Sequence, residues 1–251
     1  LALGTPASLL AGPTAVSFEG LLNAEDVNGY YSSGFGSLGT GPGPQLGVTF
    51  ENAQALRDFD AGGTGNFANE PSPSTVLYFL STDARVNVPA GFIGPVSVWY
   101  SSINASGTFE VYSGLNGTGV RLAIASLPAL GSDIGGGDPN GAYNRWAQVT
   151  LPFVGIGRSI RFGGIANQIA FDNLNINTLC LADITGLGGV PIPPDGQMTV
   201  DDVISYVNAY SEGESIADVT GLGGLPALPD LQVTVDDLIA FVSSYSSGCE
   251  N

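Results

Sequence analysis

The sequence predicts a mainly β protein made of two parts. Residues 1–176 are expected to form a jelly-roll-type β-sandwich with an N-terminal extension over residues 1–14, and residues 180–251 a small α-helical domain. Two observations support this prediction. β-rich runs recur between turn signals in the first part, and a repeated segment followed by helical patterns fills the second. A chain of 251 residues is long enough for one large all-β domain and a small second unit.

The strands of the first part are predicted from runs rich in β-branched and aromatic residues. Several runs alternate apolar and polar residues, as around Phe109 and Val111, which is the period of a half-buried strand. About ten such runs without a convincing long helix favour a two-sheet sandwich of the jelly-roll type. The runs lie at residues 15–20, 46–50, 74–80, 85–88, 94–102, 107–114, 120–126, 145–153, 159–164 and 167–176.

Glycine and polar residues between these runs predict turns and loops. The chain contains 37 glycines without a collagen-like period, which indicates many tight turns between short strands. Residues 60–74 and 131–142 form long polar stretches. We expect both to be surface loops, where a sandwich carries its variation.

The charge of the chain excludes several classes of function. The formal net charge is −17, and the six basic residues are all arginine, without lysine or histidine. Such a chain suits a divalent cation but does not attract nucleic acid or an anionic membrane. Without histidine the commonest general base and zinc ligand is missing, and without lysine Schiff-base chemistry and a P-loop are excluded. No apolar run approaches the roughly 18–20 residues of a membrane span, so membrane insertion is not expected.

The cysteines and the first residue predict a secreted protein. The chain has two cysteines, Cys180 and Cys249, which flank the repeated segment. We expect them to form a disulfide in an oxidising compartment. The sequence starts at Leu1 without a methionine or a basic leader, and we expect a mature form whose signal peptide was removed. The predicted location is extracellular, in solution or at a cell surface.

The second part is organised by a 35-residue repeat. The segment ADITGLGGVPIPPDGQMTVDD at residues 182–202 returns as ADVTGLGGLPALPDLQVTVDD at residues 217–237. A helical pattern follows each copy, with Val203, Ile204, Val207 and Tyr210 in the first. The corresponding residues of the second copy are Leu238, Ile239, Val242 and Tyr245. We expect the two helices to pack together through their apolar faces.

The ends of both helices carry recognisable signals. Thr199 and Thr234 stand where an N-cap belongs, and Asp202 and Asp237 follow three residues later, as in a capping box. Gly213 and Gly248 are expected to end the helices.

The spacing of oxygen-bearing residues in each copy predicts a calcium loop. Calcium takes six to eight oxygen ligands, and an EF-hand-like loop supplies them at positions 1, 3, 5, 7 and 12. If the inserted residues 187–194 and 222–229 are skipped, both copies match this spacing, the seventh position supplying a backbone carbonyl. The predicted ligands are Asp183, Thr185, Asp195, Gln197 and Asp202 in the first loop, and Asp218, Thr220, Asp230, Gln232 and Asp237 in the second.

A simpler interpretation is an Asp-rich turn that caps a helix and needs no ion. Capping alone explains Asp202 and Asp237. It does not explain the other four aspartates of the two loops, because this region contains eleven acidic residues and no basic one. Asp201 and Asp236 are expected to be solvated first-turn residues favoured by the helix dipole.

The second part resembles a dockerin, in particular the GC-type dockerin-like anchor of planctomycete-like bacteria. The matching pieces are CLADITG at 180–186, TVDD at 199–202, ADVTG at 217–221, TVDD at 234–237 and SGC at 247–249. The resemblance implies a C-terminal attachment module in which calcium orders the loops and creates a docking surface. The chain departs from the pattern in the eight-residue Gly/Pro insertion of each loop and in Thr, a weaker ligand, at position 3.

The first part resembles the carbohydrate-binding-module-like sandwiches of secreted bacterial proteins. The resemblance is carried by VSFEGL at 16–21 and ANQIAFDNLNI at 166–176, the expected first and last strands. In that family, acidic residues on these strands often share a structural calcium, and Glu19 and Asp172 are the matching positions. The alternative is two surface carboxylates at strand ends.

Enzyme activity is not expected. No motif sets apart a pair of carboxylates as in a glycosidase, a serine nucleophile would have no histidine base, and the GxSxG elbow is absent.

Glycan binding is an alternative function. A sugar-stacking platform could come from Trp99, Tyr100, Trp146, Tyr30 and Tyr31, although Trp99 alternates with valines and equally suits a core position.

These observations together predict a secreted, non-enzymatic, calcium-binding structural or surface-attachment protein. Its expected partner is a second copy of the chain, giving an extracellular filament, or a cell-surface protein that docks the C-terminal domain. The apolar stretch at residues 1–14 is the expected assembly segment, because it could add to the sheet edge of a neighbouring copy. The alternative is a carbohydrate-binding module tethered through the dockerin-like anchor.

Overall fold

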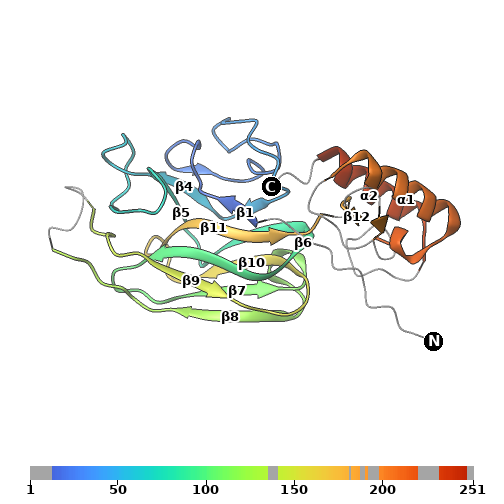
Figure 1. The fold of residues 1–251 in the computed structure, drawn as a ribbon. Helices are drawn as coiled ribbons and strands as arrows, with labels where there is room; N and C mark the ends of the chain where they lie inside the picture. Colours follow the sequence, from blue (N-terminus) through green and yellow to red (C-terminus); the bar gives the residue numbers. More distant parts are fainter. Residues whose placement is uncertain are drawn as a thin grey trace. The chain divides into compact units, whose positions relative to one another are not determined.

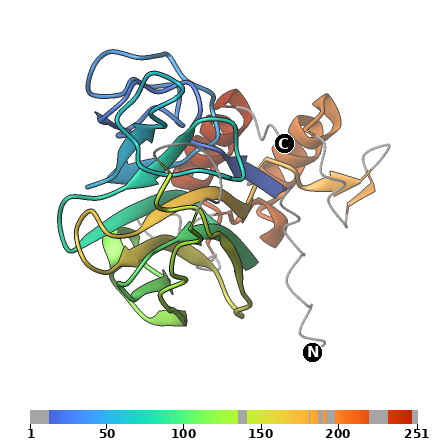
Figure 2. The same ribbon diagram turned by 90° about the vertical axis from the view of Figure 1, so that its left-hand side faces the viewer.

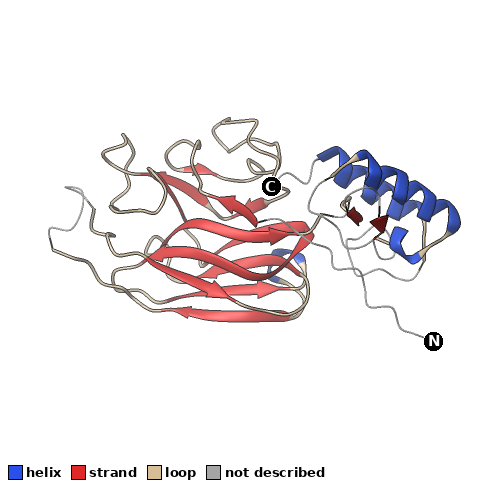
Figure 3. Ribbon diagram, in the orientation of Figure 1, coloured by secondary structure: helices blue, strands red, loops and turns tan. Residues whose placement is uncertain are grey.

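In the computed structural model the chain divides into two compact units, Pro13–Asn177 and a C-terminal unit that runs from Thr178 to Asn251. The structure describes residues 13–134, 141–180, 182–186, 190–191, 198–219 and 232–247. The first unit is built of strands, and the second carries the helices α1 and α2, as Figures 1 and 3 show. The prediction of a mainly β protein is therefore confirmed.

The first unit contains the strands β1 to β11 and one short 3₁₀-helix. Their bounds are β1 (Pro13–Val16), β2 (Glu25–Asp26), β3 (Thr49–Glu51), β4 (Gln54–Arg57), β5 (Thr75–Tyr78), β6 (Asp83–Ser101), β7 (Gly107–Tyr112), η1 (Leu115–Gly117), β8 (Arg121–Leu127), β9 (Ala147–Leu151), β10 (Gly157–Gly163) and β11 (Ala170–Thr178).

Hydrogen-bonded neighbours follow the order β2-β4-β5-β11-β6-β10-β7-β8, with β1 beside β11 and with β3 and β9 beside β6. Figure 1 shows β4, β5 and β11 on one side of the strand stack and β7, β8 and β10 on the other. The loops between β1 and β5 gather on one side of this unit, in blue to teal in Figure 2.

The long strand β6 corrects one expectation. The sequence predicts separate strands at 85–88 and 94–102, because the proline and glycine residues between them are turn signals. The structure has one strand of 19 residues whose first half pairs with β10 and whose second half pairs with β9. The backbone stays extended between the halves because Phe92 pairs with Gly157 of β10 and is fully buried.

In many strands of the first unit every second residue points to the same face, and these residues form the core. Aromatic rings of neighbouring strands contact each other in this core. The ring centroids of Phe109 and Phe162 lie 5.5 Å apart, and those of Phe162 and Phe171 lie 4.4 Å apart. Each of these rings is fully buried, and burying a side chain of this size contributes about 1.5–3 kcal/mol. The opposite faces of the strands carry polar groups, loops and a smaller apolar cluster.

The second unit contains β12 (Thr185–Gly186), β13 (Val190–Pro191), α1 (Val200–Glu212), η2 (Ser215–Ala217) and α2 (Val235–Ser247). Thr199 is the N-cap of α1 and forms the predicted capping box with Asp202, and the helix ends at Gly213, whose φ is 69°. Gly248 lies outside the described residues. None of the described helices is long and apolar enough to cross a membrane.

The helix faces that pack together match the expected ones only in part. The small core is centred on Tyr206 and Phe241, whose rings stack at 3.8 Å. Of the residues that the periodicity placed on the packed faces, those that pack against this core are Val203, Tyr210, Leu238 and Tyr245. Ile204 and Val207 of α1 are instead 54% and 53% exposed. The reason is size: the larger aromatic rings bury more apolar surface, so the helices turn those residues inward and leave the smaller aliphatic ones outside.

Candidate functional site

Two loops of the first unit are joined on the sheet face opposite the main core. The β4–β5 loop and the segment before β9 exchange backbone hydrogen bonds, from Tyr143 N to Asn66 O (3.0 Å) and from Ala68 N to Tyr143 O (3.2 Å). The Trp146 indole N–H donates to the Ala68 carbonyl at 3.0 Å. The result is a small apolar cluster separate from the main core. Its members are Phe67, Val76 and Ala170, with Leu56, Tyr143 and Trp146 packed against them.

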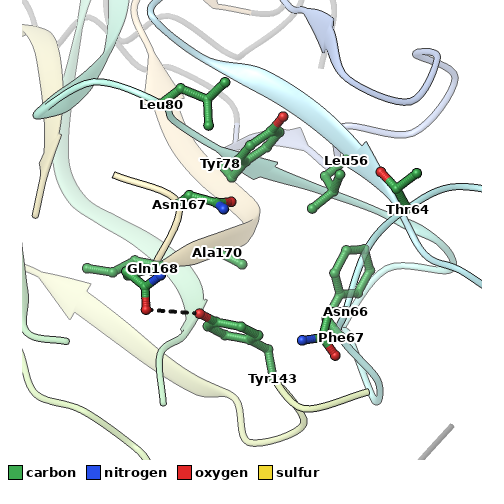
Figure 4. Close-up of a pocket in the computed structure, with 11 residues that line it drawn as sticks. Leu56, Thr64, Asn66, Phe67, Tyr78, Leu80, Tyr143, Asn167, Gln168 and Ala170 are labelled. Atoms are coloured by element: carbon green, nitrogen blue, oxygen red, sulfur yellow. Dashed lines mark hydrogen bonds between the residues drawn. The ribbon is translucent and has the colours of Figure 1, made fainter. Parts of the chain in front are cut away.

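A pocket of about 450 Å³ opens beside this cluster. Figure 4 shows the rings of Tyr78 and Tyr143 on opposite sides of it, Asn167 and Gln168 along one wall, and Phe67 on the facing wall. The described lining residues are Leu56, Thr64, Asn66, Phe67, Tyr78, Leu80, Tyr143, Asn167, Gln168, Ile169 and Ala170. All are apolar, aromatic or uncharged and polar.

The aromatic hydroxyls of the pocket are held in place. Tyr78 donates to Gln54 Oε1 at 2.7 Å, and Tyr143 donates to Gln168 Oε1 at 3.5 Å, the bond drawn in Figure 4. Burial raises the pKa of both hydroxyls, so they are neutral at physiological pH. The two rings therefore form uncharged walls of the pocket.

Asn167 presents a side-chain amide at the wall of the pocket. It sits in the turn before β11 at a φ of 57°, a left-handed conformation that asparagine tolerates. Its backbone N–H bonds to Phe79 O at 2.8 Å, but among the described residues its exposed side chain has no hydrogen-bond partner. One amide can both donate to and accept from a ligand hydroxyl.

The aromatic platform expected from the sequence does not form. Tyr31 and Tyr100 are buried in the main core, and Tyr30 packs against it. Only Trp146 lies beside the pocket, where its N–H is already bonded. The sequence analysis missed the lining residues Tyr78 and Tyr143 because loop closure, which no local pattern records, brings them together.

The structure brings Glu19 and Asp172 together, as the sequence predicts. Glu19 follows β1 and Asp172 lies in β11, and the antiparallel register of these strands, with Val16 opposite Leu174, directs both carboxylates to one place. The two acids meet at the hydroxyl of Ser72, which is 3.4 Å from Glu19 Oε1 and 2.7 Å from Asp172 Oδ1. They are not two separate surface carboxylates, because Asp172 is fully buried.

The Ser72 hydroxyl has one proton to donate, but four acceptor oxygens lie within hydrogen-bond distance of it. Besides the two carboxylates, the carbonyls of Ser17 (3.1 Å) and Thr75 (3.5 Å) face it. Carboxylates, carbonyls and a hydroxyl that converge in this way match the ligand preferences of calcium. The donor set therefore fits the predicted metal.

The electrostatics of this place support the same interpretation. Burial raises the pKa of Asp172 to about 6, and the charge of Glu19 adds to the shift against hydrogen bonds from Ser72 and Asn173. Burial raises the pKa of the nearby Tyr31 hydroxyl, and the charges of Glu19 and Asp172 raise it further. Among the described residues this buried hydroxyl has no hydrogen-bond partner of acceptable geometry. A cation here would offset the repulsion between the two carboxylates.

The repeated loops of the second unit are organised by two buried aspartates. Asp202 Oδ1 accepts from Ile184 N (3.0 Å), Thr185 N (2.9 Å) and the Thr185 hydroxyl (2.9 Å), and Oδ2 accepts from Thr199 N (2.8 Å). The second copy repeats the pattern, with Val219 N (2.9 Å) and Thr234 N (2.8 Å) donating to Asp237. Burial opposes ionisation of Asp202, but these donors outweigh it and lower its pKa.

Some predicted ligands of the repeated loops can be placed and others cannot. Asp183 and Asp218 are buried, and Gln232 is exposed. Among the described residues no group of three or more Cys, Asp or Glu side chains gathers as a metal site. Asp195, Gln197, Thr220 and Asp230 lie outside the described residues. Calcium binding by these loops stays a prediction.

The predicted disulfide falls partly outside the described residues. Cys180 is buried in the small core of the second unit, and no described cysteine is free. Cys249 lies outside the described residues, so its bond to Cys180 stays a prediction.

Comparison with known proteins places the chain in no family. No protein-family model and no curated protein matches it. It is similar to the K1 cleaved adhesin domain of Lys-gingipain from Porphyromonas gingivalis W83, with 14% identity, a TM-score of 0.38, and coverage of 66% of this chain and 98% of that one. The K2 cleaved adhesin domain of Lys-gingipain has 11% identity and a TM-score of 0.42, with coverage of 66% of this chain and 97% of that one. CsCBM6-3 from Clostridium stercorarium, whose structure was solved in complex with cellobiose, has 15% identity and a TM-score of 0.31, with coverage of 52% of this chain and 86% of that one. Values this low assign neither a ligand nor an activity.

Proposed function

We propose that this chain is a non-enzymatic extracellular binding protein whose first unit binds a neutral saccharide and whose second unit attaches it to a partner. The observation that carries the first half is the pocket between Tyr78 and Tyr143. A sugar ring presents apolar C–H faces and a rim of hydroxyls. Aromatic walls suit the faces, and an exposed side-chain amide such as that of Asn167 suits the hydroxyls.

The charge distribution favours a neutral ligand and disfavours catalysis. The chain has a net charge of −17, which repels anionic ligands, and no described lining residue is charged. A glycosidase needs two carboxylates on either side of the bond that it cleaves. The described lining of this pocket supplies none, so binding without turnover is the function that it supports.

A glycan array followed by titration calorimetry tests this proposal. Wild-type protein is expected to bind neutral oligosaccharides, and Asn167→Ala and Tyr143→Ala are expected to weaken binding at least about tenfold, the effect of losing one good polar or stacking contact. Asn104→Ala is the matched control, because Asn104 is also an exposed asparagine of the first unit. No binding by the wild type, or equal effects of the Asn167 and Asn104 substitutions, would refute the proposal.

A second observation supports attachment through the C-terminal unit. Each helix exposes an aliphatic stripe at i, i+4 and i+7, whose members are between 53% and 64% exposed. The stripes are Val200, Ile204 and Val207 on α1, and Val235, Ile239 and Val242 on α2. Exposed apolar faces of this kind are typical of protein–protein contacts. With the dockerin-like motifs, they favour a cell-surface protein as the docking partner.

Calcium is the proposed cofactor of both units. In the first unit Glu19, Asp172, the hydroxyl of Ser72 and the carbonyls of Ser17 and Thr75 would hold it. There it would neutralise two neighbouring carboxylates and stabilise the strands that carry them. In the second unit it would order the repeated loops, as the dockerin-like resemblance implies.

Assembly into a filament stays a prediction. Its expected contact segment, residues 1–14, falls almost wholly outside the described residues. Light scattering on a sizing column in calcium and in EGTA tests it, with a variant lacking residues 1–14. Polymers that persist in this variant would exclude that segment as the contact.

A further inference from the structure

The loop between β4 and β5, residues 58–74, supplies Thr64, Asn66 and Phe67 to the pocket. Its last residues are tied to the paired carboxylates. Glu19 accepts from Ser74 N (2.9 Å) and Thr75 N (2.7 Å), and also from both hydroxyls, at 3.1 and 3.2 Å. Asp172 accepts from the N–H and the hydroxyl of Ser72, both at 2.7 Å.

The sequence of this stretch explains why the carboxylates matter. The segment Pro71-Ser72-Pro73-Ser74 alternates proline with serine, so only Ser72 and Ser74 can donate a backbone N–H. Both N–H groups point to the acid pair, and Ser72 and Thr75 are buried. Without these acceptors, donors in a place that water hardly reaches would be unsatisfied.

The acid pair and the pocket also share a strand. Ala170 lines the pocket and Asp172 follows two residues later in β11, so both lie on the same face of the sheet. The start of the loop is held independently. Asn23 Oδ1 accepts from Arg57 N (3.1 Å) and Thr64 N (3.3 Å), and Gly63 N bonds to Asp58 O (2.7 Å).

We propose that Glu19 and Asp172 are positioning residues for the pocket: they hold the end of the β4–β5 loop and, together with the backbone hydrogen bonds to Tyr143, keep Asn66 and Phe67 in place for the ligand. The part of the proposal that concerns the ligand rests on the saccharide-binding function proposed above. The part that concerns the loop does not. Because the start of the loop has its own hydrogen bonds, loss of Glu19 loosens one end and leaves the fold in place.

Hydrogen exchange on the full chain tests the hold without any ligand. In Glu19→Gln the amides of residues 66–75 are expected to exchange at least about tenfold faster than in the wild type, because the charge-assisted hydrogen bonds from Ser74 and Thr75 to Glu19 are lost and the end of the loop is released. Amides of β7 and β10 are expected to keep their protection. Glu51→Gln is the control, since Glu51 is a half-exposed carboxylate paired with Arg85 on another strand. Unchanged exchange in residues 66–75 overturns the proposal.

Binding of cellotriose, xylotriose and maltotriose is then measured with the same proteins. If the wild type binds one of them, Glu19→Gln is expected to weaken that binding at least about tenfold while Glu51→Gln leaves it within about twofold. Equal affinity of Glu19→Gln and the wild type overturns the link to the pocket. If the wild type binds no saccharide, the proposed function fails, and the exchange result still decides whether the carboxylates hold the loop.

A second variant covers the case in which Glu19→Gln does not fold. Ser72→Ala removes the hydroxyl between the two acids and leaves both carboxylates in place. It is expected to speed exchange in residues 66–75 as well, though by less than Glu19→Gln. Exchange identical to that of the wild type would then count against the proposal.

Discussion

The hydroxyl of Thr185 donates a 2.9 Å hydrogen bond to the carboxylate of Asp202, 17 residues further along the chain. The sequence assigns these two residues to one calcium loop, and the structure does place them side by side. The Asp202 carboxylate also accepts a hydrogen bond from the backbone N–H of Thr199, the N-cap of α1. Asp202 therefore connects the repeated loop directly to the helix. This arrangement matches the capping interpretation, and a metal role for Asp202 stays a prediction.

Replacement of Asp202 by alanine is expected to destabilise the second unit by about 2–4 kcal/mol, because a buried acceptor of several backbone and hydroxyl donors is lost. Thermal unfolding followed by circular dichroism at 222 nm measures this, since the α-helices described lie in this unit. Asp201→Ala is the control and should cost at most about 1 kcal/mol. Equal losses in the two variants would contradict the role assigned to Asp202.

Glu25 is expected to make the first unit sensitive to acid. It is fully buried and accepts from Leu22 N (2.8 Å), Leu38 N (2.9 Å) and Thr40 N (3.1 Å). Burial opposes ionisation, but the hydrogen bonds from Thr40, Leu22 and Leu38 outweigh it and lower the pKa of Glu25 below its ordinary value of 4.5. Because the folded state holds the proton less tightly than the unfolded state, its contribution to stability is full above pH 4.5 and is lost as the pH falls below it.

Urea unfolding followed by tryptophan emission tests this, because Trp99 and Trp146 both lie in the first unit. Glu25→Gln is expected to lower the free energy of unfolding at pH 7 by about 1.5–3 kcal/mol and to reduce its dependence on pH below 5. A variant with the acid sensitivity of the wild type would show that another carboxylate is responsible.

Calcium removal is expected to affect both units, and native mass spectrometry can count the bound ions. Glu19→Gln should abolish one binding event, and Asp183→Asn and Asp218→Asn should each abolish a different one. Addition of EGTA should lower the melting temperature of the wild type, because an ion that binds only the folded state stabilises it. A protein that binds no calcium in its native buffer would remove calcium from the proposed function.

The exposed stripes of α1 and α2 are expected to serve attachment and not folding. Ile204→Ser and Ile239→Ser, alone and together, should leave the melting temperature nearly unchanged because both side chains are more than half exposed. Retention of labelled protein on the producing cells should fall most in the double variant. Tyr206→Ser is the contrasting change and should unfold the second unit, because Tyr206 is fully buried. Undiminished retention in the double variant would exclude the stripes.

Much of the fold follows from local pattern, and the exceptions have physical reasons. Alternating runs located most strands of the first unit, because each strand buries one face in the same core. The two-residue strand β2 and the short strand β4 were not predicted, since a few residues carry no period. The strand β6 was divided in two because the sequence cannot show that β9 and β10 pair with its two halves.

The sequence by itself determined the two-part organisation, the helix caps at Thr199 and Gly213, and the candidate pair Glu19 and Asp172. Each depends on spacing, repetition or a resemblance that is visible along the chain. The tertiary structure alone decided which apolar residues of α1 are buried, that Ser72 lies between the two acids, and that residues around Asn66, Tyr143 and Asn167 enclose one pocket. These relationships join segments far apart in sequence, and they follow from strand register and loop closure, which only the packed chain settles.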